Sequence, residues 1–231
     1  SNSNNVGVGA SALTAITTAA GNVAIGAGAG VAITTSTENV VVGKDAFAAA
    51  DAGQNYNIVI GSGAGQSMNA AACDSNVIIG HSASTGGVAA IQSCVVIGSE
   101  AMNSTGNEAQ TGTIAIGASA LTALTSGGNN LAIGYQAMLQ HVDGAGNTVV
   151  GSGAMVATGA TNAKTSHNNT VMGKDAMGGT WAAYGTDACV VIGSEALEGA
   201  LNNVDGTVSI GYQSLHSLTT GAGNVAVGYE S

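Results

Sequence analysis

The chain has 231 residues, among them 37 glycines, one phenylalanine, one tryptophan and no proline, and its formal net charge is −10. Thirteen carboxylates stand against three lysines and no arginine, which disfavours nucleic acids and anionic membrane surfaces as partners, because phosphate binding relies on basic side chains. The scarcity of aromatic residues indicates a thin repetitive core, and no apolar run is long enough to cross a membrane.

A short apolar segment that ends on glycine recurs along the whole chain. Asn22-Val23-Ala24-Ile25-Gly26 is a clear copy, and it returns as Asn39-Val40-Val41-Val42-Gly43. Aligning the chain with itself gives thirteen copies whose glycines are 17 to 22 residues apart. Self-similarity at this period is typical of a solenoid. The repeat glycines are Gly9, Gly26, Gly43, Gly61, Gly80, Gly98, Gly117, Gly134, Gly151, Gly173, Gly193, Gly211 and Gly228.

Each copy predicts a β-strand with apolar residues on both faces. The residue directly before the glycine is apolar in all thirteen copies, and the residue three places before it is apolar in eleven. These two positions share one face of a strand, and we expect that face to line the inside of the coil. The residue between them, such as Ala24 or Val41, would point outward, yet it is rarely polar. A second buried face needs a covering, and the simplest covering is a further copy of the chain.

Asparagine precedes the predicted strand in nine copies, four residues before the glycine. At this position the side chain can bond a turn backbone, or it can form an amide ladder with its counterparts in neighbouring coils. The nine residues are Asn5, Asn22, Asn39, Asn57, Asn76, Asn130, Asn147, Asn169 and Asn224, and the other copies carry Cys94, Thr113, Cys189 and Thr207.

The residues after the glycine predict a tight corner. The glycine itself indicates either a positive φ or a close approach of two backbones. Three residues past it comes alanine in eleven copies and serine in the other two, so this position has little room. One residue further on, a larger apolar side chain such as Phe47 or Met138 is common, and we expect it to refill the core.

The connectors between the predicted strands differ along the chain. The first two are nearly uncharged and rich in threonine, those from residue 44 to 112 carry most of their charge as carboxylates, and the two longest lie side by side in sequence near residues 156–168 and 178–187. Insertions in a solenoid form loops on its rim, often on the binding side. Aromatic residues beside polar ones suit recognition of a sugar or a protein. We therefore take the candidate receptor site to be Trp181, Tyr184, Asp187, Lys164 and His167. The alternative is that Trp181 is buried under its own connector or against a neighbouring chain.

The charged and nucleophilic residues do not form a recognisable catalytic or metal site. Glu195 and Glu198 are close in sequence, and aspartates follow lysines at Asp45 and Asp175, but we expect a solvated surface there rather than the carboxylate pair of a glycosidase. The four histidines lack metal-ligand spacing, so neither a metal site nor a cofactor is expected. Three cysteines do not make a disulfide framework, and we expect them to be small buried residues, with metal binding or an interchain bridge as alternatives.

The repeat Asn-x-Val-Ala-Ile-Gly-x-x-Ala resembles the head repeats of trimeric autotransporter adhesins, known as YadA-like or Hep/Hag repeats. The best matches are 22–29, 130–137 and 224–231. The variant Gly134-Tyr135-Gln136-Ala137 resembles arrays in bacteriophage tail fibres. The resemblance spans essentially the whole chain, and it implies a left-handed β-roll, a parallel homotrimer and a role in attachment. The connectors here are longer than those of the adhesin repeat.

The sequence thus predicts an all-β protein, a parallel β-solenoid of about thirteen coils over residues 1–231. We expect a non-enzymatic attachment fibre, extracellular on a phage or a bacterial surface, which binds a glycan or a protein receptor. The first residue is not methionine and the last repeat is short, so we also expect a fragment or a processed product. The alternatives are a purely structural filament without a receptor, a polysaccharide-cleaving enzyme and, less favoured because its threonine pairs are irregular, an ice-binding solenoid.

Overall fold

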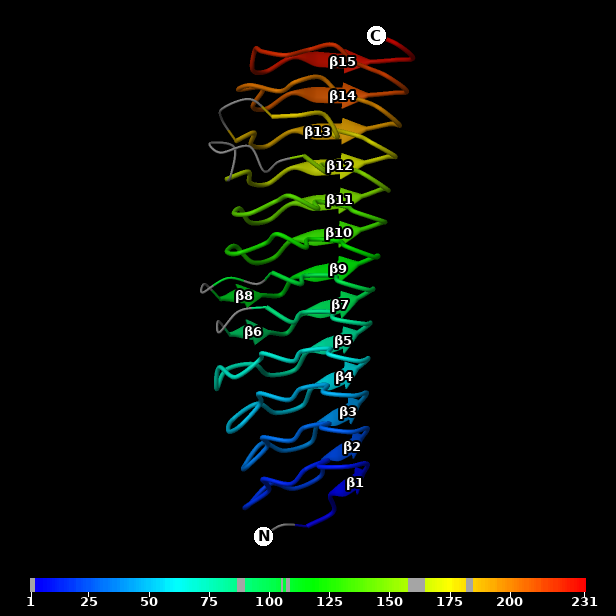
Figure 1. The fold of residues 1–231 in the computed structure, drawn as a ribbon. Helices are drawn as coiled ribbons and strands as arrows, with labels where there is room; N and C mark the ends of the chain where they lie inside the picture. Colours follow the sequence, from blue (N-terminus) through cyan, green and yellow to red (C-terminus); the bar gives the residue numbers. More distant parts are fainter. Residues whose placement is uncertain (1–2, 87–89, 105, 107–108, 158–164, 182–184) are drawn as a thin grey trace. The chain divides into compact units, whose positions relative to one another are not determined.

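Each of the two units of the protein is built around a stack of short parallel strands (Figure 1). The described residues contain strands, turns and bends but no helix, which confirms the predicted all-β parallel β-solenoid. Contacts divide the chain into two units, Ser1–Thr113 and Ile114–Ser231. The computed structural model describes residues 3–86, 90–104, 106, 109–157, 165–181 and 185–231.

The first unit consists of short strands that pair in parallel with the strand of the next repeat. Residues at the same repeat position face each other across each pair, for example Val23 with Val40 and Ile25 with Val42. Two further strands, β6 (Ile91–Gln92) and β8 (Gln110–Thr111), pair with each other in the connectors. The main strands are β1 (Val6–Val8), β2 (Val23–Ile25), β3 (Val40–Val42), β4 (Ile58–Ile60), β5 (Val77–Ile79) and β7 (Val95–Ile97).

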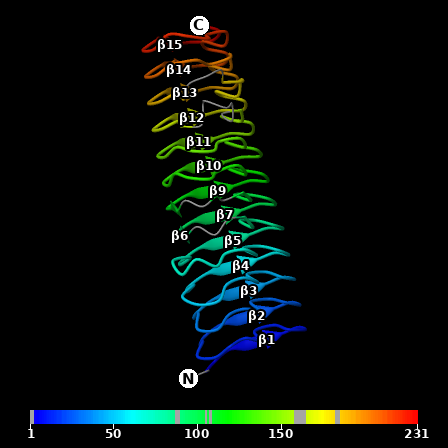
Figure 2. The same ribbon diagram turned by 60° about the vertical axis from the view of Figure 1, so that its left-hand side comes forward.

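The second unit repeats this arrangement, as Figure 2 shows from another side. Its strands also pair in parallel and in register, and isolated bridges join three connectors at Ser126, Asp143 and Thr165. Its strands are β9 (Ile114–Ile116), β10 (Leu131–Ile133), β11 (Thr148–Val150), β12 (Thr170–Met172), β13 (Val190–Ile192), β14 (Val208–Ile210) and β15 (Val225–Val227).

The middle residue of every main strand except the terminal β1 and β15 is buried and points into the core, so the predicted orientation of the strands was wrong. Ala24 and Val41 are fully buried, whereas Ile25 is 42 % exposed and Val40 is 37 % exposed. The reason lies in the preceding asparagine. Asn22 shares a strand face with Ala24, because side chains alternate along a strand, and Asn22 is itself fully buried. The buried amide therefore fixes the face that points inward, and the flanking valines and isoleucines point outward.

The repeat glycines have a positive φ and also lie where two backbones approach closely, so both explanations that the sequence offered for them apply. Their φ angles lie between 132 and 151°, a region that L-amino acids rarely adopt. A Cβ atom on Gly26 would also lie 2.5 Å from the carbonyl oxygen of Gly43 in the next repeat. The corners of successive repeats are thus in direct backbone contact, and each glycine is required for two separate reasons.

Left-handed residues follow the corner, and they bring large side chains into the core. Phe47 has φ 52° and Met138 has φ 54°, and both side chains are fully buried. The backbone N–H of Phe47 donates to the carbonyl oxygen of Ala64 in the next repeat at 2.9 Å, and Met138 donates to Ala154 at 3.0 Å. Hydrogen bonds between repeats therefore offset the cost of about 1–2 kcal/mol for each left-handed residue.

The asparagines before the strands form a hydrogen-bonded ladder inside each unit, with one exception. Asn224 was predicted as a member, but its Nδ2 donates to the carbonyl oxygen of Gly221 in its own connector, because the preceding repeat has Thr207 and offers no amide oxygen. The backbone N–H and side-chain Nδ2 of Asn39 both donate to Oδ1 of Asn22, and Nδ2 also donates to the backbone oxygen of Gln54 at 2.9 Å. The same pattern joins Asn147 to Asn130 in the second unit. Each amide thus bonds its counterpart and a connector carbonyl at once, so the two roles that the sequence offered are both filled.

Two buried cysteines continue the ladder by one step. The backbone N–H of Cys189 donates to Oδ1 of Asn169 at 3.0 Å, and its Sγ lies 3.2 Å from the carbonyl oxygen of Val204. Cys94 makes the equivalent contacts with Asn76 and Gln110. Burial raises the pKa of the Cys189 thiol to about 11, so the group stays a neutral donor at physiological pH.

Candidate functional site

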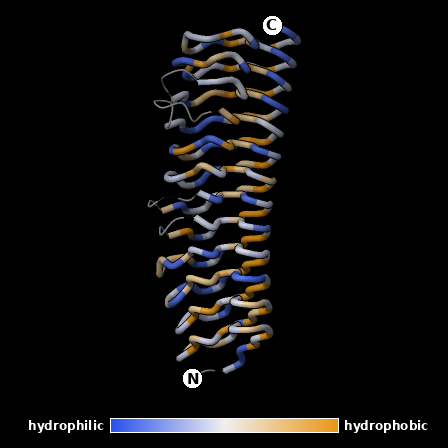
Figure 3. Tube along the Cα trace, viewed as in Figure 1, coloured by the Kyte–Doolittle hydropathy of each residue, from blue (hydrophilic) through white to orange (hydrophobic). Residues whose placement is uncertain are grey.

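An exposed apolar surface runs along the strands of each unit, and we call it the outward strip. It consists of the first and third residues of every main strand. In the first unit its most exposed members are between 37 and 55 % accessible, namely Val6, Val8, Ile25, Val40 and Ile58. In the second unit they are Met172, Ile192, Val225 and Val227. Figure 3 shows the hydrophobic colouring of the strands in each unit.

The outward strip carries no ionisable side chain, although the chain as a whole is acidic. The described carboxylates lie on corners and connectors instead, such as Asp45 and Asp51. Contiguous apolar surface without charge is unusual on a soluble monomer and marks an interaction surface. Covering it would stabilise the complex by about 25 cal/mol for each Å² of apolar area removed from water.

The geometry of the strip is periodic. Residues at one repeat position align in register, so Val23, Val40 and Ile58 form one column and Ile25 and Val42 belong to another. Adjacent parallel strands are separated by about 4.8 Å, and a partner must repeat its side chains at the same spacing to stay in register over several strands. A second copy of this chain meets that requirement without any further adjustment.

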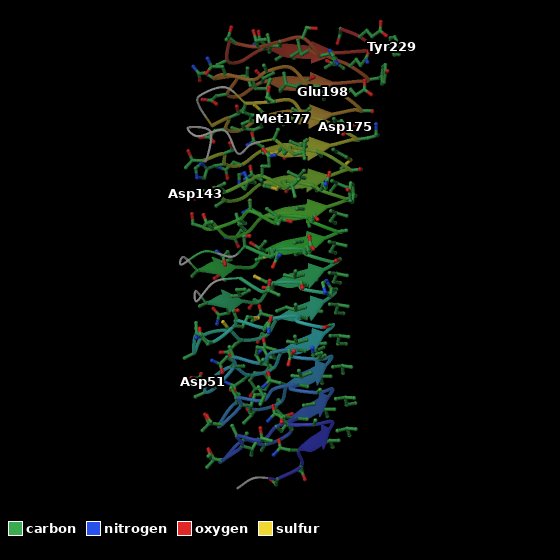
Figure 4. The ribbon with its side chains drawn as sticks, in the orientation of Figure 1. Asp51, Asp143, Asp175, Met177, Glu198 and Tyr229 are labelled. Carbon is green, nitrogen blue, oxygen red and sulfur yellow. The ribbon has the colours of Figure 1, made fainter. Side chains whose placement is uncertain are left out.

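The tryptophan of the candidate receptor site is not on the surface. Trp181 is 2 % exposed, and its Nε1 donates to the carbonyl oxygen of Met177 at 3.4 Å. Figure 4 labels Met177, which is itself fully buried. Trp181 therefore packs under its own connector, and the expectation that its ring faces a ligand is corrected. Tyr184 and Lys164 lie outside the described residues.

The two other residues of that candidate site do meet. The backbone N–H of His167 donates to Oδ1 of Asp187 at 2.6 Å, and the His167 Nδ1 atom lies 3.4 Å from the same oxygen. The N–H of Asp187 donates in turn to Oδ1 of Asp205 at 2.9 Å. Both aspartates line a surface cavity of about 280 Å³, together with Thr165 and Asn203 among others. This cavity presents carboxylate oxygens, which accept hydrogen bonds from hydroxyl or amine groups.

The lysine–aspartate neighbours are surface ion pairs, as the sequence suggested. The Lys44 Nζ to Asp45 Oδ2 distance is 3.7 Å, and the corresponding distance from Lys174 to Asp175 is 2.8 Å. Both lysine side chains are at least two-thirds exposed. Exposed pairs of this kind contribute about 1 kcal/mol or less, so we assign them no role beyond the surface.

Glu195 and Glu198 lie close together on the partly exposed corner after β13, beside His216. One carboxylate oxygen of each lies within 4.8 Å of the other and of a nitrogen of His216. Burial, and then the nearby Glu195 carboxylate, raise the pKa of Glu198. His216 was not predicted to join them, although it holds the same repeat position as Glu198, and the stacking of successive repeats brings it beside these two glutamates.

A carboxylate pair of this separation is also found in retaining glycosidases. Two observations count against that chemistry here. Oε2 of Glu195 accepts a hydrogen bond from Nε2 of Gln213 at 2.7 Å, and neither glutamate lines the nearby cavity formed by Gln213, His216 and residues after them. A general acid needs a pocket that holds the sugar against it, and the glutamates stand beside this cavity rather than in it.

His141 is the one described histidine in the core of its unit. Its side chain is fully buried, and burial lowers its pKa to about 4, so it is neutral at physiological pH. It occupies the repeat position of Leu124, Ile33 and Met68, which are also buried. We therefore interpret His141 as a core residue, not a catalytic base.

Comparison with family models, curated proteins and solved structures finds no match to this chain. In the part of the chain that the structure describes, no helix has the length and apolar character needed to cross a bilayer.

Proposed function

We propose that this chain is a segment of a non-enzymatic, extracellular attachment fibre, in which identical copies pack along the outward strip. Each of the thirteen repeats would form one coil of a left-handed roll. The exposed, uncharged and periodic strip is the observation that carries the proposal. The resemblance of the repeats to trimeric adhesin heads and phage tail fibres supplies the number of copies, three, and their parallel direction.

The strip explains why a second copy is the preferred partner. Two acidic chains repel each other wherever their corners and connectors meet, but the strip brings only valine, isoleucine, leucine, methionine and threonine to the contact. In a parallel arrangement the side chains of both copies repeat at one spacing, so they can interdigitate along every strand. A partner without this repeat would match only a few strands.

The oligomeric state tests the proposal. Native mass spectrometry and multi-angle light scattering of the full chain should give a trimer at micromolar concentration. Replacing Val40 and Ile58 together by lysine places two charges on adjacent repeats of the strip, and we expect this variant to dissociate into monomers.

The matched control is Ser62→Lys. Ser62 is exposed and occupies the corner position that Lys44 holds in the preceding repeat, so a lysine there fits the fold. This variant should remain a trimer. A monomeric wild-type chain would overturn the proposal, as would a double variant that keeps its trimer.

The receptor would be a cell-surface glycan or protein, and the long connectors of the second unit are the proposed contact. Asp187 and His167 are exposed residues of that region, and Asp187 lines the same cavity as Asp205. Its acidic lining favours neutral or amine-bearing ligands over anionic ones. Binding of the trimer to glycan arrays and to bacterial cells tests this part, with Asp187→Ala expected to weaken binding at least tenfold.

The second candidate is a structural filament without a receptor. The same strip favours it, because packing between copies needs no further ligand. A trimer that binds no glycan and no cell surface would decide for the filament. Release of oligosaccharides from capsule or lipopolysaccharide by the purified chain would decide against both candidates.

A further inference from the structure

A mixed set of metal-binding groups gathers on one corner of the second unit. Glu195 and Gln213 are the second residues after their repeat glycines, and Glu198 and His216 are the fifth. Because successive repeats stack in register, these four residues form two adjacent columns of two side chains each. Figure 4 labels Glu198 on this part of the chain, which follows β13.

The distances among the ligand atoms suit a small cation. One carboxylate oxygen of Glu195, one of Glu198 and a ring nitrogen of His216 all lie within 4.8 Å of one another. The Glu198 Oε2 to His216 Nε2 distance is 3.5 Å. Zinc binds nitrogen and oxygen at about 2.0–2.2 Å in a tetrahedron, which places its ligands roughly 3.4 Å apart. Small rotations of the glutamate side chains would complete this geometry.

The electrostatics of the cluster favour a cation as well. The two glutamate carboxylates carry like charges and lie close together, so they repel each other. A divalent ion between them would relieve that repulsion. The imidazole of His216 distinguishes this cluster from a purely acidic patch and selects the type of metal. Calcium and magnesium prefer oxygen ligands, whereas zinc binds imidazole and carboxylate together.

We propose that Glu195, Glu198 and His216 bind one zinc ion per chain. The fourth ligand is water or the side-chain oxygen of Gln213, whose amide donates to Glu195 when no metal is present. The ion joins two successive repeats on the corner, away from the outward strip. Its binding stabilises the folded chain in proportion to the logarithm of the zinc concentration.

Isothermal titration of the full chain with zinc chloride, after removal of metals with a chelator, tests the proposal. We expect one ion per chain, bound with a Kd of about 10 µM or tighter. Glu198→Gln and His216→Gln should each weaken binding at least tenfold, and cobalt should give the visible spectrum of a four-coordinate site in the wild type but not in these two variants. Zinc should also raise the Tm of the wild type but not of these variants.

His167→Gln is the matched control. His167 is exposed and pairs with Asp187 at 3.4 Å, so it has a similar histidine–carboxylate contact, but among the described residues no third ligand group completes a cluster there. This variant should bind zinc like the wild type. The proposal fails if the wild type does not bind zinc at about 100 µM, or if His167→Gln weakens binding as much as His216→Gln does. If one cluster variant does not fold, Glu195→Gln takes its place.

Discussion

Oδ1 of Asn22 accepts two hydrogen bonds from Asn39, one from the backbone N–H and one from the side-chain Nδ2, each at 3.0 Å. Both residues are fully buried. The interior of the first unit therefore contains a polar column in which each amide is bonded within its own column and to a connector.

Asn39→Ala tests the energetic weight of this column. The change removes the donor to Gln54 and the acceptor used by Asn57, which leaves buried polar groups without partners. We expect a loss of about 2–4 kcal/mol in the free energy of unfolding, measured by denaturant titration at fixed protein concentration. Asn39→Cys should cost less, because Cys94 fills the same position and its thiol reaches the connector carbonyl. Equal losses for the two variants would contradict this account of the ladder.

Gly26→Ala tests the corner. The added Cβ would meet the Gly43 carbonyl oxygen at 2.5 Å, and the φ of 136° is unfavourable for alanine. We expect destabilisation by more than about 3 kcal/mol, or failure to fold. Gly206→Ala is the matched comparison, because Gly206 has φ 65° and an added Cβ meets nothing within 4 Å. That variant should lose only about 1 kcal/mol. Circular dichroism and thermal melts of both variants measure these losses of stability, and equal losses would contradict the prediction.

His141 predicts a pH dependence of stability. Its pKa is lowered from 6.5 to about 4 in the folded chain, with burial as the first cause and Asp143 and His167 as the charged neighbours. Below pH 6.5 the unfolded chain takes up a proton that the folded chain does not, so stability falls as the pH drops from 6.5 to 4. The loss is about 3 kcal/mol at full extent.

His141→Leu separates this effect from other titrations. Leucine occupies the same repeat position at Leu124, so the core should accept it. The variant should keep its stability between pH 6.5 and 4 better than the wild type does. Denaturant titrations of both proteins across that pH range measure the free energy of unfolding at each pH. If that free energy falls equally with pH in the variant and the wild type, His141 is not the responsible group.

Trp181 offers a direct probe of its burial, because it is the chain's single tryptophan. With 2 % of the residue exposed, its fluorescence should resist quenching by acrylamide and shift to longer wavelength on unfolding. Trp181→Ala should destabilise the second unit by about 3–5 kcal/mol, whereas Trp181→Phe should be milder. Strong quenching by acrylamide in the folded state would show that Trp181 is exposed, and it would contradict this prediction.

The sequence predicted the repeat, its glycine corner and the large residue that follows, because each depends on local geometry. Gly26 needs a positive φ whatever surrounds it, and Phe47 is apolar at a position where the chain re-enters the core. The orientation of the strands could not be judged from hydrophobicity, because Val40 and Val41 are equally apolar. The asparagine was the available signal, since a buried amide ladder at Asn39 places Val41 inside.

The candidate site was less accessible to such reasoning. The burial of Trp181 depends on the path of its connector, which no repeat position specifies. His216 approaches Glu198 because both are the fifth residue after a repeat glycine and successive repeats are stacked in register. The sequence carries that correspondence, but the distance between the two side chains depends on their rotamers, which a repeat position does not specify.

The asparagine column also has a direction. Each Oδ1 accepts from the residue that comes later in the chain, as Asn22 does from Asn39 and Asn39 from Asn57. A finished repeat therefore offers ready acceptors to the repeat that leaves the ribosome after it, so assembly can proceed from the N-terminal side as templated growth. The backbone N–H groups of Cys94 and Cys189 donate the last hydrogen bond of each run, and because neither residue has an amide oxygen, the templating column ends at each of them.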